Sequence, residues 1–185
     1  MANLRIDGLT ELSKTINNDV EVMIEIGSHL GYSTKVFLEN VDNLKQLTCI
    51  DAWENGYDSR DGISQNCDMV ATEKYFDEYI MNNHNNVKKM KMSSTQAAKL
   101  IKDKSVDFVY IDACHTYEAV KEDIINYLPK VKDSGWIAGH DIDWPTKETP
   151  YFPGVRQAVL EIFGREPQIF CDNSWLFKID TVRHI

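Results

Sequence analysis

Residues 20–33 read VEVMIEIGSHLGYS, an apolar run that stops at a glycine and continues in a helical pattern. The run at residues 20–26 is short and rich in β-branched residues, which favours a strand buried in the middle of a parallel sheet. From residue 29 to residue 40 the apolar positions recur every three or four residues, which predicts a helix with one buried face. A strand that leads directly into a helix is the repeating unit of α/β proteins.

The same alternation continues through the rest of the chain. It predicts further strands at residues 47–50, 87–92, 106–111 and 136–139, and helices at residues 69–81, 95–102, 115–128 and 155–163. Ser94 is expected to cap the helix that begins at residue 95. Residues 169–171 and 175–179 are typical of a hairpin, which makes the last strand antiparallel. We therefore predict one α/β domain over residues 1–185, with a mostly parallel sheet between helices.

The composition excludes several classes of protein. The chain has 185 residues, 43% apolar and 26% charged, which is the balance of a folded globular protein. Its net charge of −9 and its lack of a basic stripe disfavour nucleic acid as a partner. No apolar run approaches the roughly 20 residues of a membrane span, so we expect a cytoplasmic protein with no membrane partner. The four cysteines form no C-x-x-C pair and indicate neither a zinc site nor a disulfide framework.

Two glycines and an acidic residue suggest a nucleotide site. Gly27 and Gly31 follow the first strand, where small residues let a ligand approach the backbone and the start of a helix favours polar groups. Asp51 ends the next predicted strand, where an acid can accept hydrogen bonds from ribose hydroxyls. The alternatives are tight-turn packing for the glycines and a solvated carboxylate for Asp51. The combination favours the nucleotide site over these alternatives, and the long polar segment at residues 52–68 is expected to be a lid or binding loop.

A second group of polar residues follows two later strands. Asp112 ends one of them, and His140 and Asp141 end the next. Because neighbouring parallel strands end at one crevice, these side chains are expected to converge, and they offer ligands for a divalent ion such as Mg²⁺ or Mn²⁺. His115 stands three residues beyond Asp112, and an imidazole suits the removal of a proton from a hydroxyl at neutral pH. The alternative for His115 is a helix-start histidine bonded to a neighbouring loop.

Five blocks of the chain resemble those of a known family. They are EIGSHLGYS at residues 25–33, CID at 49–51, VYIDACHTYE at 109–118, GWIAGHD at 135–141 and PGVRQAV at 153–159. Together they resemble class I S-adenosylmethionine-dependent methyltransferases, in particular a small O-methyltransferase-like branch with I-D-x-x-H-x-Y-E and G-H-D blocks. The resemblance implies a Rossmann-like, three-layer fold with a seven-stranded sheet of order 3-2-1-4-5-7-6. Its antiparallel seventh strand agrees with the hairpin predicted separately from the residues.

The resemblance also implies roles for individual residues. The residues implied to line the methionine end of S-adenosylmethionine are Glu25, Gly27, Ser28 and Ser33, and Gly31 and Asp112 are also implied to bind the cofactor. Asp51 would hold the ribose, Ala52 or Trp53 would cover one face of the adenine, and Ser93 or Ser94 would lie by its edge. Trp53 fits equally well as a lid anchor or a core residue.

The resemblance implies catalytic and metal-binding roles in the second group. His115 would be the general base, acting beside Asp112. The implied metal ligands are Asp112, His140 and Asp141. His140 departs from the oxygen ligands of the metal-dependent O-methyltransferases, and a histidine suits manganese, iron or zinc better than magnesium.

The predicted function is therefore O-methylation of a small molecule that carries a hydroxyl, such as a sugar or polyol, with possible help from a metal ion. Two alternatives remain: a catalytically silent S-adenosylmethionine-binding module, and a metal-dependent hydrolase. The hydrolase would use Asp112, His115, His140 and Asp141. A nicotinamide-dependent oxidoreductase is disfavoured because the third glycine of its fingerprint is missing. The small-molecule acceptor is the expected partner, and a homodimer is a general expectation without support from particular residues.

Overall fold

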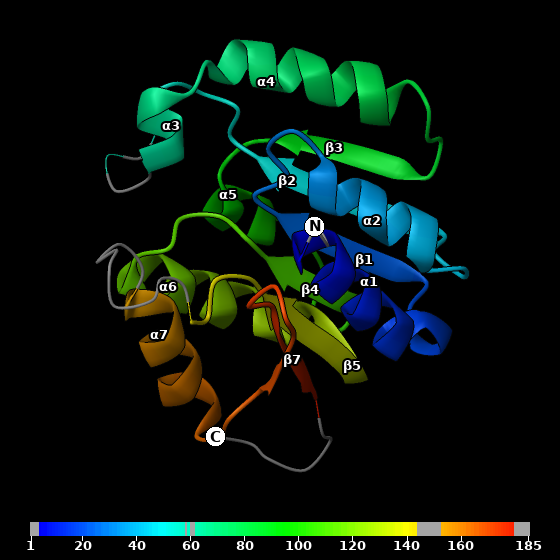
Figure 1. Ribbon diagram of the computed structural model, residues 1–185, viewed down its shortest axis with the longest axis vertical. Helices are drawn as coiled ribbons and strands as arrows, with labels where there is room; N and C mark the ends of the chain where they lie inside the picture. Colours follow the sequence, from blue (N-terminus) through cyan, green and yellow to red (C-terminus); the bar gives the residue numbers. More distant parts are fainter. Residues whose placement is uncertain (1–3, 58, 60–61, 144–152, 180–185) are drawn as a thin grey trace.

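The computed structural model describes residues 4–57, 59, 62–143 and 153–179. A seven-stranded sheet of order β3-β2-β1-β4-β5-β7-β6 runs through its centre (Figure 1). The strands are β1 (Val22–Ile26), β2 (Gln46–Asp51), β3 (Val87–Lys91), β4 (Val106–Ile111), β5 (Val131–Gly139), β6 (Gln168–Ile169) and β7 (Trp175–Lys178). The α-helices are α1 (Leu4–Ile16), α2 (Tyr32–Asn40), α3 (Gly62–Asn66), α4 (Met69–Phe76), α5 (Ser94–Ala98), α6 (Tyr117–Tyr127) and α7 (Pro153–Phe163).

The pairing of the strands confirms the predicted fold class and strand order. β3, β2, β1, β4 and β5 pair in parallel, so that their carboxyl ends form one edge of the sheet. β7 pairs antiparallel with both β5 and β6. The hairpin that the sequence predicted is therefore confirmed.

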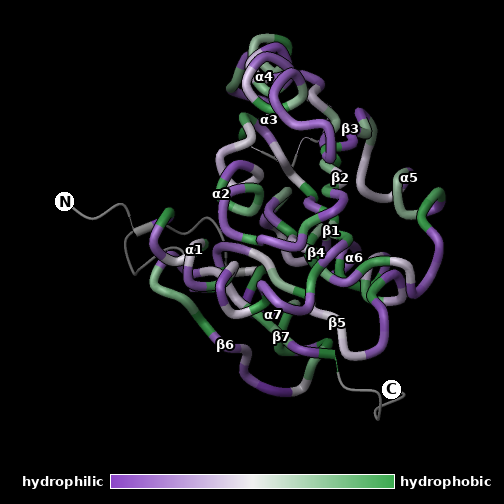
Figure 2. The backbone as a smooth tube through the Cα atoms, turned by 90° about the vertical axis from the view of Figure 1, so that its right-hand side faces the viewer, coloured by the Kyte–Doolittle hydropathy of each residue, from purple (hydrophilic) through white to green (hydrophobic). Residues whose placement is uncertain are grey.

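Two apolar cores lie on opposite faces of the sheet. Figure 2 shows α1 and α2 on one side of β1 and β4, and α5 and α6 on the other. The first core joins the sheet to α1, α2 and α4 through side chains such as Leu12, Phe37 and Phe76. The second joins it to α5, α6 and α7 through side chains such as Ile124 and Val159. Strands covered on both faces are apolar along their whole length, and for this reason the apolar runs of β1 and β4 predicted strands in the sequence.

The helix α1 was not predicted from the sequence. Leu9, Leu12 and Ile16 follow one another at helical spacing and are almost completely buried against the sheet. Most of the other positions of the helix are polar, so the short apolar stripe does not stand out in the sequence. This omission matters because α1 begins beside the carboxyl edge of the sheet.

Several predicted boundaries are corrected by local geometry. α2 begins at Tyr32 instead of residue 29, because Gly31 has a φ of 82° that helical residues do not adopt. Ser93, not Ser94, caps α5: its hydroxyl accepts from the backbone N–H of Gln96, whose side chain reaches back to the Ser93 N–H. The predicted helix at 69–81 is α4 followed by a π-helical turn, Asp77–Met81. None of the described helices is both long enough and apolar enough to cross a bilayer.

Candidate functional site

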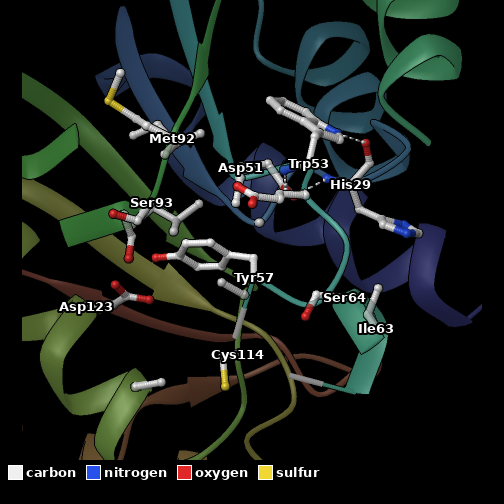
Figure 3. A pocket seen from close by; sticks show the side chains of 18 of the residues that line it. His29, Asp51, Trp53, Tyr57, Ile63, Ser64, Met92, Ser93, Cys114 and Asp123 are labelled. Carbon is white, nitrogen blue, oxygen red and sulfur yellow. Dashed lines mark hydrogen bonds between the residues drawn. The ribbon is translucent and has the colours of Figure 1, made fainter. Parts of the chain in front are cut away.

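A cavity opens at the carboxyl ends of β1, β2 and β4 (Figure 3). The sequence-predicted residues that line it are Gly27, Asp51, Ala52, Trp53, Ser93, Ser94 and Asp112. They come from four separate segments, which the parallel strands bring to one edge. His29, from the glycine loop, and Tyr57, from the predicted lid or binding loop, also line it. Lining residues that the sequence did not single out include Met69, Met92, Cys114 and Asp123.

Asp51 is held in a defined orientation at the end of β2. Its Oδ2 accepts a hydrogen bond of 2.9 Å from the backbone N–H of His29, and its Oδ1 accepts one of 2.8 Å from that of Trp53. Figure 3 shows both bonds, which tie the loop after β1 to the loop after β2. Asp51 is partly exposed and borders the cavity, so the solvated strand-end carboxylate of the sequence alternative does not describe it.

The two glycines of the loop after β1 have different roles. Gly27 has a φ of 87°, and a Cβ on it would lie 2.1 Å from the carbonyl oxygen of Asp112. It therefore permits the ends of β1 and β4 to approach each other on the wall of the cavity. Gly31 packs against helix side chains, since its Cβ would lie 2.5 Å from Ile80 Cγ1, and it does not line the cavity. Tight-turn packing is the better description of Gly31.

Glu25, Ser28 and Ser33 also lie away from the cavity wall. Glu25 is fully buried and accepts a hydrogen bond from the hydroxyl of Thr34. Burial raises the pKa of Glu25, and the nearby hydroxyls of Ser33, Thr34 and Ser28 act in the opposite direction. Glu25, Ser28, Gly31 and Ser33 are not among the residues that line the cavity, and their implied contact with the cofactor stays a prediction.

Trp53 is a core residue, which was one of the alternatives open from its sequence. Its side chain is 1% exposed, its Nε1–H donates to the backbone oxygen of His29 at 2.9 Å, and its ring packs on Phe76. The Nζ of Lys89 lies 4.9 Å from the ring centre. The indole thus packs in the core, while Trp53 and Ala52 both border the cavity, and the adenine contact implied for one of them stays a prediction.

Asp112, His115, His140 and Asp141 converge beside this cavity, as the topology predicted. His115 Nε2 lies 2.7 Å from Asp141 Oδ2 and 3.5 Å from Asp112 Oδ1. His140 Nδ1 lies 2.8 Å from Asp141 Oδ1, and its Nε2 lies 3.7 Å from Asp172 Oδ2. The His140 ring therefore lies between Asp141 on its Nδ1 side and Asp172, at the tip of the last hairpin, on its Nε2 side.

The charges of this group are strongly coupled. Burial lowers the pKa of His115, but contacts with Asp112 and Asp141 outweigh it and raise the pKa to about 9. The pKa of His140 is also raised, because Asp141 and Asp112 outweigh its burial. The pKa of Asp141 is lowered well below its usual range, because the hydrogen bonds and charges of His115 and His140 outweigh burial.

Arg5 joins the group from α1, and nothing in the sequence motifs pointed to it. Its Nη2 donates to Asp112 Oδ2 at 2.7 Å. The Arg5 side chain is 50% exposed, whereas that of Asp112 is 8% exposed, so the guanidinium covers the solvent side of the carboxylate. A helix prediction over residues 4–16 would have been needed to place Arg5 near the carboxyl edge.

The donor atoms close enough to share an ion include two of the three predicted ligands. Among the described residues, Asp112, His115 and Asp141 offer ligand atoms within 4.8 Å of one another. His140, the third predicted ligand, has its Nδ1 2.8 Å from Asp141 Oδ1 and 3.9 Å from Asp112 Oδ1, and its role as a ligand stays a prediction. The three atoms fit an ion only in part: Arg5 already contacts Asp112, and His115 already contacts Asp141.

Residues 24–142 match the family model of the methyltransferase domain. The chain belongs to this methyltransferase family. The family match and the seven-stranded sheet agree with the class I S-adenosylmethionine-dependent methyltransferase domain that the quoted blocks predicted. A relative from Sinorhizobium fredii, described as the uncharacterized protein y4gI, is 26% identical over 153 residues. The match covers 80% of this chain and 15% of that relative, so the methyltransferase chain spans only a small part of its length.

Solved structures share the methyltransferase fold. An O-methyltransferase from Bacillus cereus in complex with S-adenosylhomocysteine matches with a TM-score of 0.62 and 15% identity, over 95% of this chain and 79% of that one. A Podospora anserina methyltransferase with bound S-adenosylhomocysteine matches with a TM-score of 0.65 and 14% identity, over 97% and 80% of the chains. A Corynebacterium glutamicum protein matches with a TM-score of 0.65 and 17% identity, over 100% and 84%. At these identities the likeness concerns the fold.

Proposed function

We propose that the chain transfers the methyl group of S-adenosylmethionine to a hydroxyl oxygen of a small molecule of the sugar or polyol type. The observation that carries the proposal is the position of Asp112, which lines the cavity and also belongs to the group around His115. A methyl donor in the cavity and a hydroxyl beside His115 would therefore meet at Asp112. Such alignment of the two reactants is a major source of rate enhancement.

The cavity supports the cofactor half of the proposal. Asp51 would accept hydrogen bonds from the ribose hydroxyls, with its carboxylate already oriented by two backbone amides. Gly27 would leave room for the methionine part beside Asp112. Ala52, Ser93 and Ser94 border the part of the cavity assigned to the adenine.

His115 supports the transfer half. The raised pKa of about 9 keeps His115 mostly protonated at neutral pH, so the proposed base is its neutral form, which is favoured at alkaline pH. That form would take the proton of the acceptor hydroxyl as the oxygen attacks the methyl carbon; the C–S bond breaks, and its electron pair stays on sulfur to give S-adenosylhomocysteine. Asp141, 2.7 Å from His115 Nε2, would hold the imidazole and stabilise its protonated form. Metal assistance is left out of this scheme, because Arg5 and His115 already contact the carboxylates that would hold an ion.

Calorimetry with S-adenosylhomocysteine tests the cofactor half, with NAD as the control ligand. We expect S-adenosylhomocysteine to bind and NAD not to bind. A panel of sugars and polyols, assayed for S-adenosylhomocysteine formation from S-adenosylmethionine, then tests transfer. Binding without turnover on any hydroxyl acceptor would support the silent binding module, and metal-dependent hydrolysis without cofactor binding would support the hydrolase.

A further inference from the structure

Arg5 lies outside the residues that the family model matches, yet it contacts the centre of the proposed reaction site. Asp112 Oδ2 accepts from Arg5 at 2.7 Å, and Asp112 Oδ1 faces His115 at 3.5 Å. Both carboxylate oxygens therefore have a partner from the chain. We propose that Arg5 supplies at Asp112 the positive charge that an ion supplies in metal-dependent methyltransferases, so that this site works without a divalent ion.

The position of Arg5 is set by the packing of α1. Gly8 lies one turn further on the same face, and a Cβ on Gly8 would lie 2.2 Å from Asp172 Oδ1. The missing side chain thus lets α1 lie directly against Asp172. Leu9 and Leu12 continue this face and are at most 1% exposed. Arg5 is consequently presented by a helix that is anchored in the core.

A divalent ion would have to disrupt existing contacts to bind at this cluster. Oxygen ligands lie about 2.0–2.6 Å from Mg²⁺ or Ca²⁺. His115 Nε2 and Asp141 Oδ2 are themselves only 2.7 Å apart, so an ion held by both must separate them. It must also share Asp112 with the guanidinium, and like charges at such distances repel strongly at a partly buried site.

The guanidinium can also do part of the work of an ion. It carries five N–H donors, of which the contact with Asp112 Oδ2 uses one. Because half of the side chain is exposed, other donors remain accessible to an acceptor oxygen. A fixed positive charge there would stabilise the oxygen as it loses its proton to His115. This catalytic role of Arg5 rests on the proposed function, whereas the exclusion of a divalent ion by Arg5 can be tested independently of it.

Titration with Mn²⁺, followed by the electron paramagnetic resonance signal of the free ion and by calorimetry, tests the proposal. The variants are Arg5→Gln, Arg5→Met, which keeps an apolar stem, and Arg5→Lys, which keeps the charge. In the wild type we expect no binding at the cluster at millimolar Mn²⁺. The Arg5→Gln and Arg5→Met variants should gain about tenfold or more in Mn²⁺ affinity, and Arg5→Lys should show no gain. Adding Asp112→Asn to Arg5→Gln should abolish the gain. Circular dichroism verifies that each variant is folded.

Lys45→Gln is the matched control, because Lys45 forms a 2.8 Å pair with Glu21 at the opposite edge of the sheet. It should leave Mn²⁺ binding unchanged. The proposal would be overturned if the wild type bound Mn²⁺ as tightly as the Arg5 variants. It would also be overturned if Arg5→Gln and Arg5→Met were folded but did not gain Mn²⁺ affinity. S-adenosylhomocysteine affinity, measured on the same samples, reports separately on the proposed function: its absence in the wild type would refute that function, whatever the Mn²⁺ result.

Discussion

The cavity at the carboxyl ends of β1, β2 and β4 and the group around Asp112 are built in different ways. In the cavity, Asp51 is oriented by backbone amides of the loops that follow β1 and β2, each next to its own strand. In the Asp112 group, side chains orient side chains: His115 contacts Asp141, and Arg5 comes from a helix 107 residues away in the chain. The first region depends on local turns, and the second depends on packing between distant elements. Substitutions should therefore affect the two regions independently.

Replacing His115 by Gln should have the largest effect. Loss of a general base lowers turnover by about 10²–10⁴-fold. Because His115 does not line the cavity, the affinity for S-adenosylhomocysteine should remain within about twofold of the wild type, a change of less than about 0.5 kcal/mol. Steady-state kinetics on an accepted hydroxyl compound and calorimetry provide the two readouts. A parallel loss of affinity and turnover would show that the two regions are not independent.

Replacing Asp51 by Ala should reverse that pattern. Charge-assisted hydrogen bonds contribute about 1.5–3 kcal/mol each, so the affinity for S-adenosylhomocysteine should fall by about 10- to 100-fold. The control is Glu122→Gln, which removes another carboxylate from the cavity wall. Equal losses in the two variants, measured by calorimetry, would mean that Asp51 acts only through the charge of the cavity.

Replacing Gly8 by Ala should separate α1 from Asp172. The added Cβ would lie 2.2 Å from Asp172 Oδ1, and the resulting strain should lower the free energy of unfolding by about 1–3 kcal/mol. Gly62→Ala is the control, since no atom lies within 4 Å of its added Cβ. Urea denaturation measures both variants. Cofactor affinity should stay constant in Gly8→Ala, because α1 does not border the cavity.

The smallest effect is the dependence of stability on pH. The pKa of His115 is raised from 6.5, the ordinary value for histidine, to about 9 in the folded protein, so its contribution to stability is complete below about pH 6.5. That contribution is lost as the pH rises through 9. We expect the free energy of unfolding to fall by about 1–2 kcal/mol more between pH 7 and pH 9 in the wild type than in His115→Gln. Identical pH profiles for the two proteins would contradict the coupling of His115 to Asp112 and Asp141.

Much of the reaction site was predictable, and the exceptions have physical causes. The convergence of Asp112 and Asp141 was predictable because strand ends meet at one edge of any parallel sheet, and His115 was found by its position three residues after Asp112. The contact of His140 Nε2 with Asp172 was not predictable, because only the path of the last hairpin brings Asp172 to that ring. Glu25 lies in β1, where it accepts a hydrogen bond from Thr34 of α2, a partner that only the packing of that helix supplies.

Local patterns along the chain were sufficient for the α/β class, the strand order implied by the family resemblance, and the strand-end carboxylates. They suffice because strands covered on both faces must be apolar throughout, and because polar residues just after them must lie at one edge. Only the folded chain places Arg5 on Asp112 and the indole of Trp53 in the core. These contacts join segments far apart in the sequence, and no local periodicity encodes which long-range partners meet.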